Sequence, residues 1–225
     1  DIACIIYTSG TTGEPKGVVL LHEAFLEVLK IHDIRLTMIS SKDTSMNFLP
    51  LAHIFEKAWT YYCLHRGINV IINHDPREIL KSIRQTHPSL MCRVPRFWEK
   101  VYSGVNEKIS ASKGIVKWIY KDAIKTGKKY NVDYKNNGLK APFGNRIKFA
   151  IYNNTVYFLL KFVIGINRGN LFPCAGAPLS PKIIEFRQSV NIPIFIGYGL
   201  TETNATVSCY PDIGVVIESV GTVMP

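Results

Sequence analysis

Short apolar runs alternate with longer stretches of helical periodicity along most of the chain. The apolar runs predict strands at Ala3–Tyr7, Ser45–Leu49, Ile68–Ile72, Leu90–Val94, Leu171–Ala175, Pro193–Ile196 and Ala205–Cys209. The helical stretches are His22–Ile31, Ile54–His65, Arg77–Thr86, Pro95–Ser110, Ile115–Lys128, Ile147–Ile164 and Pro181–Val190. This alternation predicts an α/β fold with largely parallel sheets and helices on both faces.

Three further segments have distinct patterns. Asp1–Tyr7 reads as a buried strand and not as a signal peptide. The polar stretch from 131 to 145, with three Gly or Pro residues, predicts a surface loop. The longest apolar run, Val156–Ile166, is interrupted by Lys161 and Gly165 and falls short of the roughly 20 residues that a membrane span needs.

Composition limits the class of protein. An apolar fraction of 47% with 20% charged residues in 225 residues excludes a disordered chain. Five cysteines without a C-x-x-C pair indicate reduced thiols in a cytoplasmic protein. Ten Lys or Arg and two Asp lie between Lys113 and Lys148, so this segment holds +8 of the net charge of +10.

The stretch "YTSGTTGEPKGV", Tyr7 to Val18, follows the first predicted strand directly. Glycines allow close approach to the backbone, successive amides and hydroxyls form an anion site, and Lys16 adds a positive charge. The pattern therefore predicts a polyphosphate site, with an ordinary flexible turn as the alternative. Gly10 and Gly13 are too close together for a Walker A loop, and the kinase-type glycine pattern is absent as well.

A second polar cluster, "GYGLTET" from Gly197 to Thr203, follows another predicted strand. A dinucleotide fingerprint would need a glycine at Glu202, so that interpretation fails. Tyr198, Thr201 and Glu202 instead offer an aromatic face, a hydroxyl and a carboxylate at the end of a strand, where open α/β sheets bind ligands. A carboxylate beside phosphates needs a cation between them, and Mg²⁺ is the usual one. A solvated turn is the alternative.

Both stretches resemble the signatures of the AMP-forming adenylating enzymes, which include acyl-CoA synthetases, luciferases and peptide-synthetase adenylation domains. The resemblance implies that Tyr198 stacks on adenine, Thr201 contacts the α-phosphate, and Glu202 and Thr8 ligate Mg²⁺. The implied catalytic residues are Lys16, Thr201 and Glu202. The implied nucleotide- and phosphate-binding residues are Thr8, Ser9, Gly10, Thr11, Thr12, Gly13, Lys16, Gly176, Ala177, Pro178, Gly197, Tyr198, Gly199 and Thr201.

A third match is "CAGAPLS", Cys174 to Ser180, which is similar to a family turn whose backbone lies beside the adenine. Ala175 stands where a glycine is common in the family. If the backbone there needs a positive φ, Ala175 is strained. The final "SVGTVMP" resembles the segment that follows the adenine-binding strand in the family.

The stretch "LPLAHIFEK", Leu49 to Lys57, contains a His and a Glu near a predicted helix start. A metal pair and a packed histidine are both open interpretations from the residues alone. The family resemblance implies that His53 lines the acyl pocket. "VPRFWEKVY", Val94 to Tyr102, is similar to a segment of long-chain fatty acyl-CoA synthetases, so the resemblance favours a fatty acid substrate.

Lysines recur every four residues from Lys113 to Lys129, interleaved with apolar residues. A solvated surface helix is the default interpretation of this basic helix. The sharper hypothesis is contact with an anionic membrane surface, which would place the protein in the cytoplasm or peripherally at the inner membrane surface. Nucleic-acid binding is the weakest alternative, because no recognition motif accompanies the charge, and we expect no nucleic-acid partner.

The resemblance implies ATP-dependent activation of a long-chain fatty acid to an acyl-adenylate and then to acyl-CoA, with Mg²⁺ as cofactor and ATP and CoA as co-substrates. Residues 1–225 would form part of the AMP-binding domain within the large N-terminal domain of such an enzyme. The family's preceding segment and its mobile C-terminal domain are expected to lie outside this chain, which by itself would be inactive. A non-catalytic nucleotide- or lipid-binding module that keeps these motifs is the alternative.

Overall fold

The computed structural model describes residues 1–9 and 13–225, and within them helices and strands alternate as the pattern predicts. The strands are β1 (Ile2–Thr8), β2 (Lys16–Leu21), β3 (Thr44–Asn47), β4 (Asn69–Ile72), β5 (Phe172–Cys174), β6 (Ile194–Leu200), β7 (Ala205–Cys209) and β8 (Thr222–Val223). The α-helices are α1 (His22–Arg35), α2 (Ile54–His65), α3 (Ile79–Thr86), α4 (Pro95–Ala111), α5 (Gly114–Gly127), α6 (Phe143–Asn154), α7 (Val156–Ile164) and α8 (Pro181–Ser189).

The predicted α/β fold is confirmed, but the sheets are small and mixed and not clearly largely parallel. β3 and β4 are parallel, and so are β5 and β6, but β1–β2, β6–β7 and β7–β8 are antiparallel. Isolated parallel bridges from Leu90 to Ser45 and to Leu171 join β3 to β5. Residues 90–94, predicted to be a strand, supply only such bridges, because the segment passes directly into α4 at Pro95.

Alternate residues of the central strands face two different cores, which places helices on both faces of the sheet as predicted. Ile194 and Ile196 of β6 pack with Trp98 of α4 and Ile183 of α8. Phe195, between them, packs instead with a core that includes Trp59, Tyr62 and Leu171. This is the period-two alternation of a strand that is covered on both sides.

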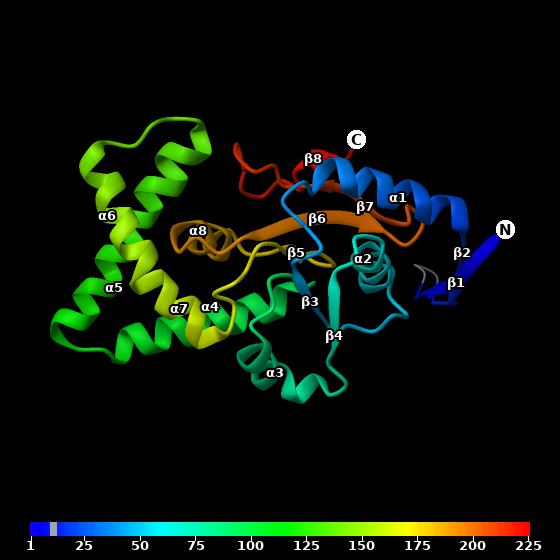
Figure 1. Cartoon of the computed structure of the whole chain (residues 1–225), viewed down its shortest axis with the longest axis horizontal. Coiled ribbons are helices and arrows are strands. Elements are labelled where there is room, and N and C mark those ends of the chain that lie inside the picture. The colour runs from blue at the N-terminus through cyan, green and yellow to red at the C-terminus, as the bar shows by residue number, and fades with distance from the viewer. Residues whose placement is uncertain (10–12) are drawn as a thin grey trace.

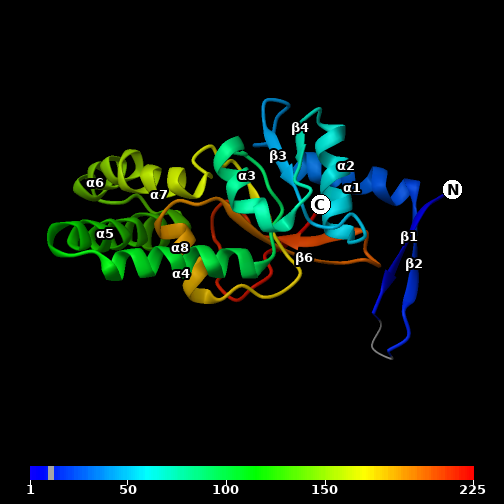
Figure 2. The ribbon, with the colours of Figure 1, turned by 90° about the horizontal axis from the view of Figure 1, so that it is seen from below.

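The first two strands form a hairpin at one end of the molecule, far from α5, α6 and α7 (Figures 1 and 2). The strand predicted near the start of the chain is confirmed as β1, but its expected burial is not, because within β1 only Ile6 is buried. β1 pairs with β2, and the hairpin buries Ile6 and Leu20 in a core with Phe25 and Ile54, against which other hairpin residues, Ala3, Cys4 and Val18, pack while partly exposed.

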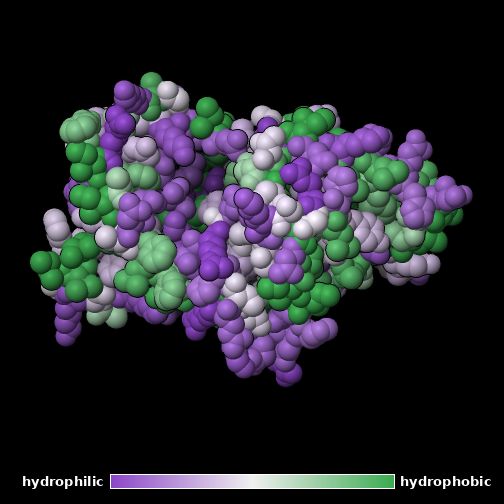
Figure 3. Space-filling view, viewed as in Figure 1, coloured by the Kyte–Doolittle hydropathy of each residue, from purple (hydrophilic) through white to green (hydrophobic). Residues whose placement is uncertain are grey.

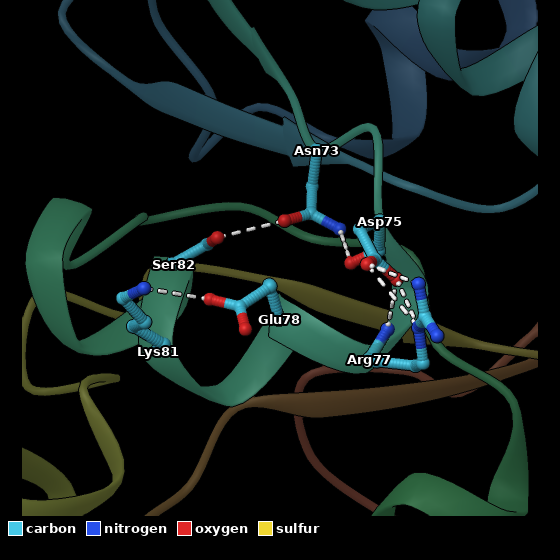
Figure 4. A network of polar contacts seen from close by, with 6 residues as sticks. All are labelled: Asn73, Asp75, Arg77, Glu78, Lys81 and Ser82. Atoms are coloured by element: carbon cyan, nitrogen blue, oxygen red, sulfur yellow. Dashed lines mark hydrogen bonds and ion pairs between the residues drawn. The ribbon is translucent and has the colours of Figure 1, made fainter.

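The turn from β4 into α3 is fixed by a local polar network (Figure 4). Asp75 caps a short 3-10 helix, Pro76–Glu78, by accepting a hydrogen bond from the Arg77 amide at 2.9 Å. Asn73 donates to the Asp75 carbonyl at 2.7 Å and accepts a 2.7 Å hydrogen bond from Ser82 in α3. The helix predicted from Arg77 is therefore divided into a 3-10 turn followed by an α-helix.

The region from 128 to 164 is more helical than its pattern predicts. Lys128–Tyr134 continues α5 as a π-helix and Lys135–Asn137 forms a 3-10 turn, so the predicted loop from 131 to 145 is largely wrong. Asn131 explains this in part, because its side chain is buried and donates to the Gln188 carbonyl at 2.8 Å. The helix predicted from 147 to 164 begins at Phe143 and is interrupted at Thr155.

One helical stretch in the described part of the chain, Phe143–Ile164, is long and apolar enough to cross a membrane by length and composition. It has 22 residues; its 18-residue apolar window has a mean hydropathy of 1.2, and only 6% of that window is buried. The sequence analysis underestimated the length of this helical stretch, because it counted only the contiguous apolar run from Val156 to Ile166, whereas the helical stretch also includes the whole of α6.

Candidate functional site

The β1–β2 hairpin carries the glycine-rich stretch. Thr8 is the register partner of Lys16, and the Thr8 hydroxyl donates to the Lys16 carbonyl at 3.5 Å. The antiparallel pairing thus brings together a hydroxyl and an ammonium group that are eight residues apart. Gly13 has a φ of +86°, a conformation that favours glycine. The predicted phosphate-binding residues Gly10, Thr11 and Thr12 lie outside the described residues.

The second motif lies on a second hairpin, formed by β6 and β7. Its pairing is irregular between Tyr198 and Gly199, where the register shifts. A Cβ atom on Gly199 would lie only 1.6 Å from the Ala205 carbonyl oxygen, so only glycine fits here. The second glycine of the motif thus permits close contact between the two strands.

The turn between β6 and β7 carries Thr201 and Glu202. The Thr203 hydroxyl accepts a 3.0 Å hydrogen bond from the Leu200 amide, and the Asn204 amide donates to the Thr201 carbonyl at 3.1 Å. Asn204 and Ala205 have positive φ values of 52° and 98°. Ala205 is therefore strained, and such backbone strain concentrates at functional sites.

The turn after β5 brings the "CAGAPLS" segment beside these strands. The positive φ, +92°, belongs to Gly176, so Ala175 does not carry the strain considered from its sequence. Backbone hydrogen bonds tie this turn to the 90–94 segment: the Arg93 amide donates to the Pro173 carbonyl at 2.8 Å, and the Ala175 amide donates to the Arg93 carbonyl at 3.3 Å.

These elements surround one cavity of about 830 Å³, which α2 closes on another side. The predicted site residues that line it are Thr8, Ser9, Lys16, His53, Gly176, Gly197, Tyr198, Gly199, Thr201 and Glu202. Gly13, Ala177 and Pro178 were predicted to bind nucleotide but are not among the lining residues. The cavity continues along apolar side chains, which include Leu36, Leu49, Trp59, Leu171 and Phe195.

The oxygen donors in the cavity are of the kind that bind a magnesium ion. Thr8 and Glu202, the predicted ligands, both line it. Mg²⁺ commonly binds through one or two protein oxygens together with substrate phosphates and water. Among the described residues no group of three or more His, Cys, Asp or Glu could hold a metal.

Sequence reasoning did not find two buried ionisable side chains next to the cavity, Glu56 and Arg93. Glu56 lines the cavity and Arg93 lies beside it, and both are almost fully buried. The guanidinium carbon of Arg93 lies 4.0 Å and 4.2 Å from the ring centroids of Phe48 and Phe97. No side chain of the described residues hydrogen-bonds either carboxylate oxygen of Glu56. Burial raises the pKa of Glu56 to about 8, although the backbone amide of Phe48 and the positive charge of Arg93 oppose the shift.

The signal for this pair was present in the sequence. Arg93 interrupts the apolar run from 90 to 94, and an arginine in such a run needs a specific environment. Glu56 was considered only as a metal ligand together with His53.

The chain is similar to known proteins over almost its whole length. The model of the family described as "AMP-binding enzyme" matches residues 1–225. Long chain acyl-CoA synthetase 2 of Arabidopsis thaliana is 33% identical over 99% of this chain and 33% of its own length. Long-chain-fatty-acid–CoA ligase 1 of Schizosaccharomyces pombe is 30% identical over 91% of this chain and 30% of its own length. The chain thus spans about a third of these relatives.

Solved structures show the same fold. O-succinylbenzoate coenzyme A synthetase from Bacillus subtilis, in complex with AMP, matches 100% of this chain and 35% of its own, at a TM-score of 0.63 and 17% identity. The N-terminal domain of FACL13 from Mycobacterium tuberculosis matches 91% of this chain and 38% of its own length, at a TM-score of 0.58 and 19% sequence identity. The family model, which covers every residue, and the cavity in which the motifs meet lead to one conclusion: this chain belongs to the AMP-binding enzyme family.

Proposed function

We propose that the protein containing this chain activates a long-chain fatty acid in two steps. The fatty acid carboxylate attacks the α-phosphorus of ATP, the bond to the β-phosphate breaks, and pyrophosphate leaves. The thiol of CoA then attacks the acyl carbon of the acyl-adenylate, gives up its proton, and displaces AMP to form the thioester. The supporting observation is that the glycine-rich hairpin and the Tyr198–Glu202 segment line one cavity with an apolar extension.

In this proposal each residue has a separate task. The Lys16 ammonium and the loop amides hold the pyrophosphate part of ATP, Thr201 hydrogen-bonds the α-phosphate, and Tyr198 stacks on the adenine. A magnesium ion held by Thr8 and Glu202 would neutralise phosphate charge. His53, at the start of α2, borders the apolar part of the cavity that would take the acyl chain. The protein's contribution to the first step is mainly positioning and charge stabilisation.

The long-chain substrate is supported by the names of the relatives, which include long-chain acyl-CoA synthetases from a plant and a yeast. A cytoplasmic location is part of the same proposal, because the five cysteines are free thiols and four of them are buried.

ATP–pyrophosphate exchange by the full-length protein tests the proposal. We expect exchange that depends on palmitate, and Lys16→Ala or Glu202→Gln should lower its rate by about two orders of magnitude. Lys42→Ala and Glu107→Gln remove exposed charges that do not line the cavity, and they should leave the rate unchanged. ATP binding without any exchange would instead identify a non-catalytic nucleotide-binding module.

A further inference from the structure

An unusual surface lies on the helices at the end of the molecule opposite the β1–β2 hairpin. Along α6 and α7 many solvent-exposed positions are apolar, although Arg146, Lys148 and Asn154 are exposed as well, whereas a surface helix normally exposes mainly polar residues. We call this surface the α6–α7 stripe. It consists of Phe143, Ile147, Ile151, Phe158, Leu159 and Phe162, each between 46% and 74% exposed.

Helical spacing puts these residues on one side. Phe143, Ile147 and Ile151 follow one another at steps of four residues, and so do Phe158 and Phe162. Thr155, at the interruption between α6 and α7, lies four residues after Ile151 and three before Phe158, so the helical spacing continues through it. Figure 3 shows hydrophobic side chains following α6 and α7 down one end of the molecule, with hydrophilic groups beside them. From Phe143 to Phe162, at a rise of about 1.5 Å per residue, such a stripe is about 30 Å long.

The opposite side of these helices is firmly attached to the protein. Tyr157 is fully buried, and its hydroxyl donates to the Ala123 carbonyl of α5 at 2.6 Å. The Lys148 ammonium forms an ion pair with Asp122 at 2.7 Å. The helices therefore cannot leave α5 to cross a bilayer without breaking these contacts. The two helices can instead lie flat on the surface of a bilayer, with the α6–α7 stripe facing the lipid.

The charge around the stripe selects the kind of partner. The segment from 113 to 148, which includes α5 and the first half of α6, has a net charge of +8, and most of its lysines are exposed. Two copies packed through this face would bring +8 against +8, which opposes self-association. An anionic bilayer offers both an apolar phase for the stripe and negative charge for the lysines.

We propose that the α6–α7 stripe, together with the lysines of α5, docks the protein on an anionic lipid bilayer, with α6 and α7 in the plane of the interface. This goes beyond the proposed reaction, because binding to lipid needs neither ATP nor fatty acid.

Vesicle co-sedimentation of the full-length protein, without substrates, tests this docking. We expect binding to phosphatidylcholine vesicles that contain phosphatidylserine and much weaker binding to phosphatidylcholine alone. Ile147→Gln with Ile151→Gln should weaken binding about tenfold or more. The control is Leu26→Gln with Ile34→Gln on α1, which removes two equally exposed apolar side chains far from the stripe and should change nothing.

The charge contribution is tested separately with Lys121→Gln, Lys125→Gln and Lys129→Gln. Each change should weaken binding to the anionic vesicles about fivefold and leave binding to neutral ones unaltered. Equal binding by the stripe variant and the unaltered protein would overturn the proposal. So would a stripe variant that dissociates a dimer without changing lipid binding, since the partner would then be a second copy.

A conservative variant covers the case in which the stripe variant fails to fold. Phe158→Trp keeps the apolar character of a half-exposed position. Compared with the unaltered protein, its added fluorescence should shift to the blue with vesicles and be quenched by brominated lipid. A fluorescence that is already blue-shifted in buffer and indifferent to vesicles would mean that another segment of the full-length chain covers the stripe, and the proposal would fail.

Discussion

Replacing Glu56 by Gln should remove the loss of folding stability that occurs in this protein as the pH rises. Burial raises the pKa of Glu56 from 4.5 to about 8 in the folded protein. A raised folded-state pKa gives stability that is fully present below about pH 4.5 and is lost as the pH rises towards about 8. At about 1.4 kcal/mol per pKa unit the full loss is about 5 kcal/mol, of which about 3 kcal/mol has occurred by pH 7. Since Glu56 is only 1% exposed, solvent screening does not reduce this figure.

Gln resembles the protonated carboxylic acid in shape and cannot ionise. Glu56→Gln should therefore match the unaltered protein near pH 4 and exceed its stability by about 3 kcal/mol near pH 7. Urea denaturation across this range measures the difference directly. Arg93→Met supplies the opposite perturbation. It removes the positive charge that lowers the pKa of Glu56, so the loss of stability should continue to a higher pH and its total should be larger.

A different outcome would refute this reasoning. If Glu56→Gln lowered stability by 3–5 kcal/mol at pH 7, Glu56 would be ionised and paired with Arg93, and the mutation would leave a buried charge without a partner. The flat rings of Phe48 and Phe97 beside the guanidinium group would then be insufficient to hold it. Equal effects at every pH would likewise contradict the assigned titration.

Three further predictions concern the backbone. Gly199→Ala should destabilise the protein by about 1–3 kcal/mol and weaken ATP binding in titration calorimetry, because its Cβ would overlap the Ala205 carbonyl at 1.6 Å; unchanged binding would contradict the hairpin geometry. Ala205→Gly should raise thermal stability by about 1 kcal/mol, since its φ is 98°, and a lower melting temperature would argue against strain there. Gly127→Ala should lower the free energy of unfolding, measured by urea denaturation, by about 1–3 kcal/mol, because the added Cβ would lie 1.8 Å from the Ser189 carbonyl oxygen. Gly104→Ala is the control, because its added Cβ would meet nothing within 4 Å.

Local patterns predicted local structure well and long-range arrangement poorly. The bounds of α2 are those predicted, because its apolar residues recur with helical spacing and its C-terminus is followed by Gly67. The sequence analysis did not predict β2. Gly17 is a poor strand residue, and α1 follows β2 directly with no turn residue between them, so the pattern does not mark where this strand begins or ends. Similarly, the pattern of α6 and α7 shows apolar residues on more than one side, and only the structure reveals which side faces solvent.

The site could be predicted only in pieces. Each motif indicated a phosphate or nucleotide ligand by itself, but Thr8 and Glu202 are nearly the whole chain apart, and no periodicity brings them together. Their meeting was implied by the family resemblance alone, and the shared cavity is what the structure adds. The Glu56–Arg93 pair was missed because its two members belong to segments that read as separate core elements.

The position of the cavity follows from how the central strands end. β5 pairs with β6 only as far as Cys174 and Ile196, and after that point the chain leaves the sheet in the "CAGAPLS" turn. β6 continues for four more residues, which pair with β7 on its other edge. The edge of β6 that β5 abandons is therefore free to face the cavity, and Gly197 to Leu200 line it there together with Ala175 and Gly176. A ligand site at the carboxyl end of parallel strands arises here because one strand stops and its neighbour changes partner.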